Sequence, residues 1–227
     1  MKQNNWFDPF FILENLSPEE KLIQKNVKDF SNSVLRPTVV AHNRDHKFDR
    51  DLYKEFGQLG LLGSTVKNHG GAGASSSAYG LIAYEIEKID SSYRSSISVQ
   101  SSLVIHPIDS FGSDEQKERY LPELISGIKI GCFGLTESEA GSDPSSMKTT
   151  YKKNQNGYVL NGSKNWITNA PIADVFIIWA LNDKLETNSI KGFILDKGTK
   201  GLTTSTIKNK TSLKISPTGQ IIMHDVS

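Results

Sequence analysis

Two short polar stretches hold the residues best suited to bind a reactive ligand. The first, Cys132–Asp143, is a short apolar, strand-like run that turns into residues offering small hydroxyls and backbone N–H groups. The second, Asn161–Asn169, has the same character and adds a large aromatic ring. Such groups suit a ligand that is rich in hydrogen-bond acceptors and partly anionic. We therefore expect the two stretches to form two walls of a pocket for a flat, hydrogen-bonding ligand.

The ring system of a flavin fits this description, because it is planar and carries donors and acceptors along one edge. Trp166 could cover a face of such a ring, and Thr168 could contact its hydride-accepting atom N5. On these residues alone the question stays open. A turn rich in Gly and Ser after a strand is more often an ordinary loop, and a Trp in a strand is more often part of a core.

A third candidate is Arg94, which lies in a segment of Ser and apolar residues without an acidic residue three or four positions further on. A guanidinium in a cleft binds a carboxylate through two parallel hydrogen bonds. Ser98 lies one helical turn further on the same face and could donate to the same carboxylate. Glu87 ends the preceding helix and could tune this site. The alternative is a surface Arg that pairs with Asp90 or Glu87.

The elements that must position these residues are helical up to about residue 127. Apolar side chains recur there at helical spacing, and the sequences Ser17–Glu20 and Ser113–Gln116 are capping boxes that predict two helix starts. Pro37 is predicted to end the first helix. A further helix is expected from about Ser92 to Phe111. Gly127 is predicted to close the last helix of this half.

Near Ile128 the apolar period changes from 3.6 to 2, which indicates strands. Asn156-Gly157 is a strong signal for a hairpin turn. We therefore expect an α+β fold in which an N-terminal all-helical domain, residues 1–127, precedes a small antiparallel β-barrel-like domain, residues 128–227. The predicted strands include Tyr158–Leu160, Val175–Ala180, Gly192–Leu195 and Gly219–Met223.

The composition excludes several classes of function. The 227 residues include 26 basic and 25 acidic side chains, so the net charge of +1 gives no indication of nucleic acid as a partner. No apolar run approaches the ~20 residues of a membrane span. The single Cys132 can form neither an internal disulfide nor a zinc site, and His42, His46 and His224 have no metal-ligand spacing. We expect a cytoplasmic protein without a cleaved leader.

The sequence ends at Ser227, directly after a strand-like run. A β domain that stops on a strand, with no closing turn or helix, predicts a truncated product. The alternative is that this last strand is simply the edge of the sheet.

The two polar stretches resemble the two signatures of the acyl-CoA dehydrogenases. Leu135–Asp143 resembles the first, in which a Thr-Glu pair precedes Gly-Ser-Asp, and Asn161–Asn169 resembles the second. The sequence departs from the family at Ser138-Glu139, where a Pro-Gly or Pro-Asn pair is usual. The resemblance covers essentially the whole chain and is closest to the glutaryl-CoA dehydrogenase branch. The segments that carry it are Tyr79–Asp90, Tyr93–Pro107, Cys132–Thr136 and Asp143–Met147.

The resemblance implies a helical domain, a middle β domain and a second helical domain, with FAD held between them. It also implies a homotetramer that passes electrons to an electron-transferring flavoprotein. The residues that it assigns to FAD are Phe133, Leu135, Thr136, Gly141, Ser142, Trp166, Ile167 and Thr168. Those that it assigns to the acyl-CoA substrate are Glu87, Arg94, Ser95, Ser98 and Ser142.

The implied reaction oxidises glutaryl-CoA between its α and β carbons and releases carbon dioxide to give crotonyl-CoA. The base that removes the α proton is, in this family, a Glu of the second helical domain, so the resemblance assigns no catalytic residue and no metal to this chain. A plain fatty acyl-CoA is a competing substrate. A different class of function also stays open, namely a non-catalytic fragment or relic that retains partial flavin or acyl-CoA binding.

Overall fold

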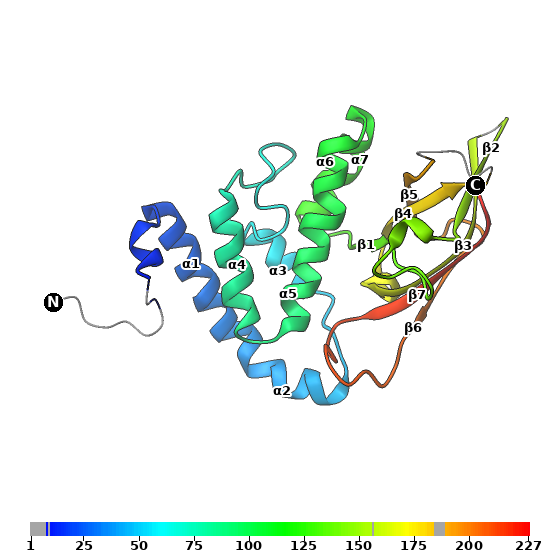
Figure 1. The fold of residues 1–227 in the computed structure, drawn as a ribbon. Coiled ribbons are helices and arrows are strands. Elements are labelled where there is room, and N and C mark those ends of the chain that lie inside the picture. Colours follow the sequence, from blue (N-terminus) through cyan, green and yellow to red (C-terminus); the bar gives the residue numbers. More distant parts are fainter. Residues whose placement is uncertain (1–7, 9, 156, 184–188) are drawn as a thin grey trace.

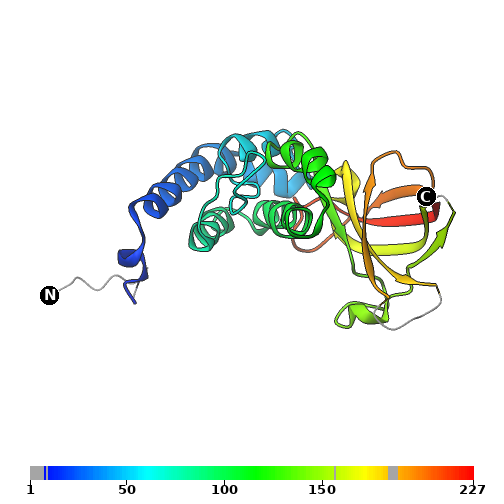
Figure 2. The same ribbon diagram turned by 90° about the horizontal axis from the view of Figure 1, so that it is seen from above.

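The computed structural model describes residues 8, 10–155, 157–183 and 189–227. A layer of helices lies beside a curled sheet (Figure 1). Seen from above, the sheet closes around its own interior at one end of the molecule, and the helices form a layer that extends away from it (Figure 2). The expected succession of a helical half and a β half is therefore confirmed.

The helical half contains seven α-helices and two π-helical segments within the described residues. The helices are α1 (Pro18–Phe30), α2 (Arg36–Asp45), α3 (Leu52–Gln58), α4 (Ser76–Glu87), α5 (Ser91–Ser98), α6 (His106–Phe111) and α7 (Asp114–Ile125). The π-helical segments are Ser31–Leu35 and Val99–Ile105, and short 3-10 turns lie at Ile12–Asn15, Pro144–Ser146 and Ala170–Ile172.

Both predicted capping boxes are present. The Ser17 hydroxyl accepts from the Glu20 N–H at 3.1 Å, and the Glu20 carboxylate accepts from the Ser17 N–H at 2.9 Å. Ser113 and Gln116 make the same reciprocal pair at the start of α7. Gly127 follows α7 with φ 74°, a left-handed conformation that costs a glycine little.

The prediction that Pro37 ends the first helix is wrong. The π-helical segment Ser31–Leu35 shifts the hydrogen-bond pattern, and the helix continues through Pro37, which falls in the first turn of α2. Pro107 is accommodated in the same way, because Val99–Ile105 is π-helical and α6 begins at His106. The helix expected from Ser92 to Phe111 is therefore present with one wide turn in its middle.

The β half is a single seven-stranded sheet with the order β1-β4-β2-β3-β7-β6, in which β5 pairs with β4. Most neighbours are antiparallel, as expected, but β1 and β2 both pair parallel with β4, so the sheet is mixed. Asn154 pairs with Gly157 at the predicted hairpin, and Asn156 lies outside the described residues. The strands are β1 (Gly131–Gly134), β2 (Thr150–Asn154), β3 (Gly157–Thr168), β4 (Val175–Asn182), β5 (Lys191–Asp196), β6 (Leu202–Thr206) and β7 (Thr218–Val226).

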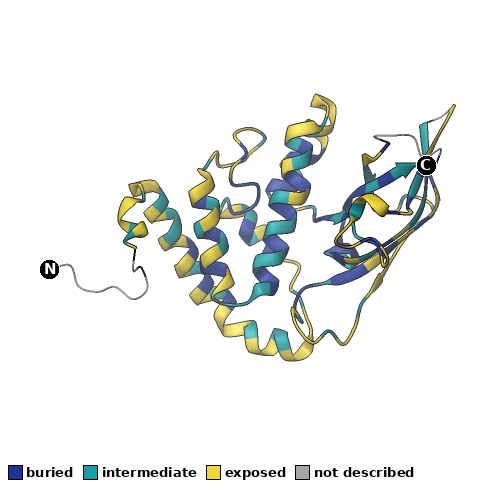
Figure 3. Cartoon of the chain, in the orientation of Figure 1, coloured by how far each residue is buried: buried dark blue, intermediate teal, exposed yellow. Residues whose placement is uncertain are grey.

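Two apolar cores hold these elements. One lies among the helices and extends to Val175 and Ile177 of β4 and to Ile215 of the loop between β6 and β7. The other fills the curl of the sheet and includes the fully buried Cys132, whose thiol pKa is raised by burial. The buried faces of the helices and of β4 are turned toward one another (Figure 3). The shared core joins β1 and β4 to the helical half.

Candidate functional site

The structure brings the two polar stretches into contact. The backbone N–H of Asn165 donates to the carbonyl of Thr136 at 2.9 Å, and the side-chain amide of Asn165 donates to the Ser138 hydroxyl at 3.2 Å. The first stretch leaves the sheet at the end of β1, and the second is the last part of β3. Residues that lie about 30 positions apart in the sequence thus form one continuous surface.

A buried ion pair fixes the two stretches to each other. The Lys164 ammonium lies 2.8 Å from a carboxylate oxygen of Glu137 and 3.1 Å from the carbonyl of Leu135. Its side chain is completely buried, and that of Glu137 is 9% exposed. Glu137 also accepts from the backbone N–H groups of Lys148 and Thr149, at 2.6 and 3.0 Å. Each charge therefore has partners at several points, as a buried charge requires.

Each member of this pair favours the charged form of the other. Burial would raise the pKa of Glu137, but the Lys164 ammonium and the donors from Thr149 and Lys148 outweigh it, and the pKa lies below its ordinary value. Burial lowers the pKa of Lys164, and Glu137 opposes that shift. Neither residue was predicted from the sequence to have a role. The sequence does contain a hint of the pair, because each stretch carries one residue of opposite charge, Glu137 in the first and Lys164 in the second. Lys164 also lies in a strand, between the apolar residues Leu160 and Ile167.

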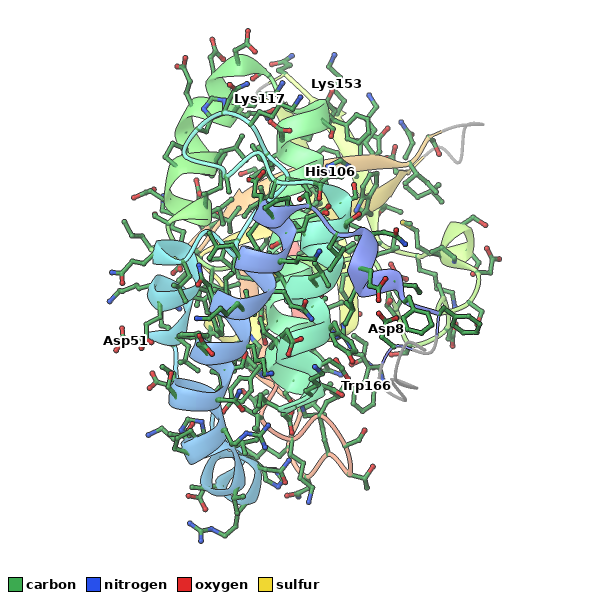
Figure 4. All side chains as sticks on the ribbon, turned by 90° about the vertical axis from the view of Figure 1, so that its left-hand side faces the viewer. Asp8, Asp51, His106, Lys117, Lys153 and Trp166 are labelled. Atoms are coloured by element: carbon green, nitrogen blue, oxygen red, sulfur yellow. The ribbon has the colours of Figure 1, made fainter. Side chains whose placement is uncertain are left out.

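Trp166 stands out from the sheet rather than within its core (Figure 4). Its side chain is 58% exposed, and its φ of 60° lies in the left-handed region that is costly for a bulky residue. The pairing of β3 with β7 shifts register between Lys164 and Ile167, as at a β-bulge. Strain of this kind persists only where neighbouring contacts impose it, and it is frequent at binding sites. The alternative that Trp166 is a core residue is excluded.

Two of the predicted flavin residues turn their side chains inward. Ile167 is 3% exposed in the core of the sheet, so only its backbone is available to a ligand. The Phe133 ring packs edge-on against Trp179, with ring centroids 6.0 Å apart, and reaches the core shared with the helices. The side chains of Leu135, Thr136 and Thr168 are half-buried at the junction of the two stretches.

The turn after Thr136 is closed despite its unusual Ser138-Glu139 pair. Glu137 and Ala140 exchange backbone hydrogen bonds of 3.1 and 3.2 Å, and Glu139 pairs with Lys148. Beyond the turn, Gly141 and Ser142 are exposed. A Cβ added to Gly141 would meet no atom within 4 Å, so the fold itself does not require a glycine there. The space over Gly141 is the kind that the edge of a ligand can occupy.

Arg94 has an acidic partner, and of the two carboxylates that the sequence left open, Asp90 and Glu87, it is Glu87. The Nε of Arg94 donates to the Glu87 carboxylate at 2.7 Å, and Glu87 also accepts from the Ser91 hydroxyl. The hydrogen bond from Ser91, and then Arg94, hold the pKa of Glu87 below its ordinary value. The other two nitrogens of Arg94 have no partner within the described part of the chain. Ser95 and Ser98 are half-buried on the same helix, α5.

Comparison with known families decides what kind of protein this is. The family profile "Acyl-CoA dehydrogenase, N-terminal domain" matches residues 17–128, and "Acyl-CoA dehydrogenase, middle domain" matches residues 132–226. The chain belongs to the acyl-CoA dehydrogenase family. The resemblance expected from the two signatures is therefore confirmed.

Individual members of the family agree with this assignment. A short-chain specific acyl-CoA dehydrogenase of Megasphaera elsdenii is 38% identical over 220 residues, which is 93% of this chain and 57% of that protein. The crystal structure of a glutaryl-CoA dehydrogenase from Mycobacterium smegmatis is 42% identical, with a TM-score of 0.92 over 96% of this chain and 56% of that one. A structure of a glutaryl-CoA dehydrogenase from the same organism, in complex with FADH2, is 39% identical, with a TM-score of 0.92 over 96% of this chain and 55% of that one. The acyl-CoA dehydrogenase chain thus spans a little over half the length of these relatives.

Two kinds of feature are absent from the described residues, namely a metal-binding cluster and a membrane-spanning helix. Within the described ranges, no three His, Cys, Asp or Glu side chains gather in a way that could hold a metal ion. None of the helices in the described part of the chain has the length and apolar character needed to cross a bilayer.

Proposed function

We propose that this acyl-CoA dehydrogenase chain binds FAD and an acyl-CoA thioester, as the N-terminal and middle parts of an enzyme that oxidises the substrate between its α and β carbons. The observation that supports this most strongly is the Glu137–Lys164 pair, because it fixes the Thr136 stretch against the Trp166 stretch. The residues fit a flavin. The space over Gly141 is open, and the exposed indole of Trp166 is held out from the sheet by a bulge.

Each proposed flavin residue has a distinct task. Thr136 would hydrogen-bond one edge of the ring system, Trp166 would cover its outer part, and Thr168 would orient the end near N5. Ser142 would bind both the phosphate-bearing part of FAD and the substrate. When bound, FAD would supply the hydride acceptor.

No carboxylate of the proposed site is free to remove the α proton. Glu137 accepts from three donors in the buried network, and Glu87 is engaged by Arg94 and Ser91. We therefore propose that the base comes from the part of the family's length that these 227 residues do not span, and that this chain alone does not oxidise acyl-CoA. The homotetramer and electron transfer to an electron-transferring flavoprotein belong to that whole enzyme.

For the substrate, we propose a thioester with a distal carboxylate, glutaryl-CoA, whose oxidation is followed by loss of carbon dioxide. Arg94 is half-exposed and has two unengaged nitrogens, and Ser95 and Ser98 lie on the same helix. A second candidate is a plain short-chain acyl-CoA. It is favoured by the Glu87 carboxylate, which already neutralises Arg94 at 2.7 Å.

Titration of the chain with FAD, followed by flavin fluorescence, tests the cofactor. Saturable quenching supports the proposal, and its absence at all concentrations contradicts it for these 227 residues. Titration of the FAD-loaded chain with glutaryl-CoA and with butyryl-CoA then tests the substrate. Arg94→Ala should weaken glutaryl-CoA binding about tenfold and leave butyryl-CoA binding nearly unchanged, because a charge-assisted hydrogen bond contributes about 1.5–3 kcal/mol.

A control for Arg94 is Arg44→Ala, which removes an exposed guanidinium that also pairs with a carboxylate, here that of Asp45. It should change neither affinity. Equal weakening of both thioesters by Arg94→Ala would reject the carboxylate site and favour the short-chain substrate.

A further inference from the structure

A cleft next to the end of the second stretch carries a concentration of positive charge. It lies where the end of α2 meets the loop between β6 and β7, which is the orange-red segment beside α2 in Figure 1. Its volume is about 590 Å³, within the range of small-molecule sites. The residues that line this lysine cleft are Asp45, His46, Lys47, Phe48, Pro171, Ile172, Thr206, Ile207, Lys208, Asn209, Lys210, Lys214, Ile215, Ser216, Pro217 and Thr218.

Three lysines of the cleft make no direct contact with a carboxylate within the described residues, although the charge of Lys47 helps to lower the pKa of Asp45. The ammonium groups of Lys47, Lys208 and Lys214 make no hydrogen bond or ion pair within the residues that the structure describes. The single carboxylate among the lining residues is that of Asp45, and Arg44 already engages it through two hydrogen bonds. The field inside the cleft is therefore positive, which favours an anionic occupant.

Lys210 adds a charge that only neutral groups surround. Its ammonium donates to the carbonyl of Leu213 at 2.7 Å, to the hydroxyl of Thr218 at 2.9 Å and to the carbonyl of Ser216. Burial lowers the pKa of Lys210, since no carboxylate offsets the loss of water. The Ser216 hydroxyl is buried beside it and has no hydrogen-bond partner within the described chain. An anion in the cleft would offset the charge of Lys210 and lie close to an unused hydroxyl.

Part of the cleft wall is apolar. Phe48, Pro171 and Ile172 come from the two sides of the junction between the helical and β halves, and Ile215 and Pro217 come from the loop. A simple inorganic anion would use the lysines and leave these walls in water. A ligand with both a flat, weakly polar ring and phosphate groups would use both kinds of surface.

We propose that the lysine cleft binds a nucleoside phosphate, with its base against the apolar walls and its phosphates between Lys208 and Lys214. This site is separate from the proposed flavin site, which is formed by the Thr136 and Trp166 stretches. The inference rests on the cavity and its charges and does not depend on which acyl-CoA the enzyme uses.

Isothermal titration of the full chain with ADP, inorganic pyrophosphate and adenosine tests the proposal. We expect one ADP per chain, weaker binding of pyrophosphate and the weakest binding of adenosine. Replacing both Lys208 and Lys214 by Ala should weaken ADP binding about tenfold or more, because two charge-assisted contacts are lost. Added salt should weaken ADP binding in the wild type more than in this double variant.

The matched control is the double variant Lys152→Ala/Lys153→Ala, which removes the same charge from exposed positions of β2. It should bind ADP like the wild type. Equal weakening in both double variants would show non-specific attraction and overturn the proposal, as would the absence of ADP binding at about 1 mM. Since Lys208 and Lys214 make no ion pair or hydrogen bond with any residue that the structure describes, circular dichroism should find both variants folded.

Titrations with CoA and with FAD extend the test, because each of these ligands contains an adenosine phosphate. If the cleft takes the nucleotide part of CoA, the Lys208/Lys214 variant weakens CoA binding as much as ADP binding; if it takes a free nucleotide, only ADP binding falls. FAD quenching should be unchanged in this variant. Loss of FAD binding together with ADP binding would show that the two sites are one and overturn the proposal.

Discussion

The side-chain carbonyl of Gln100 accepts a hydrogen bond from the backbone N–H of Gly131 at 2.7 Å, inside the core that the two halves share. The carbonyl of Gly131 accepts from the buried amide of Asn169 at 3.1 Å. One amide comes from the helical segment that follows Arg94, and the other from the end of the Trp166 stretch. The strand that leads to Thr136 is thus fixed, at its first residue, to both other parts of the proposed site.

Replacing Gln100 by Leu should therefore destabilise the chain strongly. The amide of Gln100 also donates to the carbonyls of Leu124 and Lys129, both at 2.9 Å. The variant therefore leaves the Gly131 N–H and the Lys129 carbonyl without a partner within the described residues, while the Leu124 carbonyl keeps the N–H of Gly127. Each such group costs about 1–3 kcal/mol, and we expect a loss of about 3 kcal/mol or more in the free energy of unfolding. Urea denaturation measures it. Gln220→Leu, at an exposed position of β7, should change stability by less than about 0.5 kcal/mol; similar losses in the two variants would contradict the role of Gln100.

Replacing Lys164 by Met should be equally severe, for an electrostatic reason. The variant leaves the Glu137 carboxylate buried without its cation, which costs about 3–5 kcal/mol. The double variant Lys164→Met/Glu137→Leu should recover part of this loss, since no charge remains buried. Thermal melting of the single and double variants checks it. A double variant that is less stable than Lys164→Met would show that the charge pair is not the cause.

Stability should fall on acidification partly through Glu137. Its pKa is lowered in the folded state, so its contribution is present above the ordinary carboxyl pKa of about 4.3 and is lost as the pH falls through the folded value. The free energy of unfolding of the wild type should thus decrease below about pH 4.3. In Glu137→Gln this acid decrease should be shallower, while stability near neutral pH is lower throughout. Urea titrations between acid and neutral pH measure both; parallel curves for the two proteins would assign the acid decrease to other carboxylates.

The sequence predicted the elements well where the signal was local, and less well where it depended on distant contacts. The capping boxes at Ser17 and Ser113 involve only neighbouring residues, and both are present. The parallel pairing of β1 with β4 depends on a partner about 40 positions away, and no local pattern encodes it. The prediction that the first helix ends at Pro37 was wrong because a π-helical segment, which depends on packing, precedes the proline and the helix continues through it.

The same distinction applies to the candidate site. The two stretches were recognised because each carries a run of distinctive residues. Their contact through Glu137 and Lys164 could not be predicted, because a charged residue in a strand normally indicates a solvent-facing position. For Arg94 the sequence left the choice open between a ligand carboxylate and a surface pair with Asp90 or Glu87, for a related reason. Glu87 lies seven residues earlier, beyond the turn between α4 and α5, where helical spacing gives no information.

Gly141 offers a test of ligand binding that leaves the fold unchanged. Since an added Cβ meets no atom within 4 Å and the backbone is not left-handed, Gly141→Ala should leave the melting temperature nearly unchanged. If FAD lies over this position, the methyl group should weaken FAD binding about tenfold, the effect of about 1.4 kcal/mol of lost contact. The control is Gly80→Ala in α4, which is equally open and should bind FAD like the wild type. Unchanged FAD affinity in Gly141→Ala would move the proposed flavin site away from Gly141.

Variants of Trp166 should separate the cost of backbone strain at the bulge from the contribution of the indole to FAD binding. Its left-handed backbone costs a non-glycine residue roughly 1–2 kcal/mol, and its exposed ring contributes little packing to offset that cost. Trp166→Gly should therefore be more stable than Trp166→Ala by about 1 kcal/mol, because both remove the ring but only Gly relieves the strain. Both variants should bind FAD more weakly than the wild type and equally so, since the lost contact is the indole. Urea denaturation and FAD titration of the three proteins measure the two effects separately. Equal stability of the Gly and Ala variants would show that the bulge is not strained, and full FAD affinity in both would remove Trp166 from the flavin site.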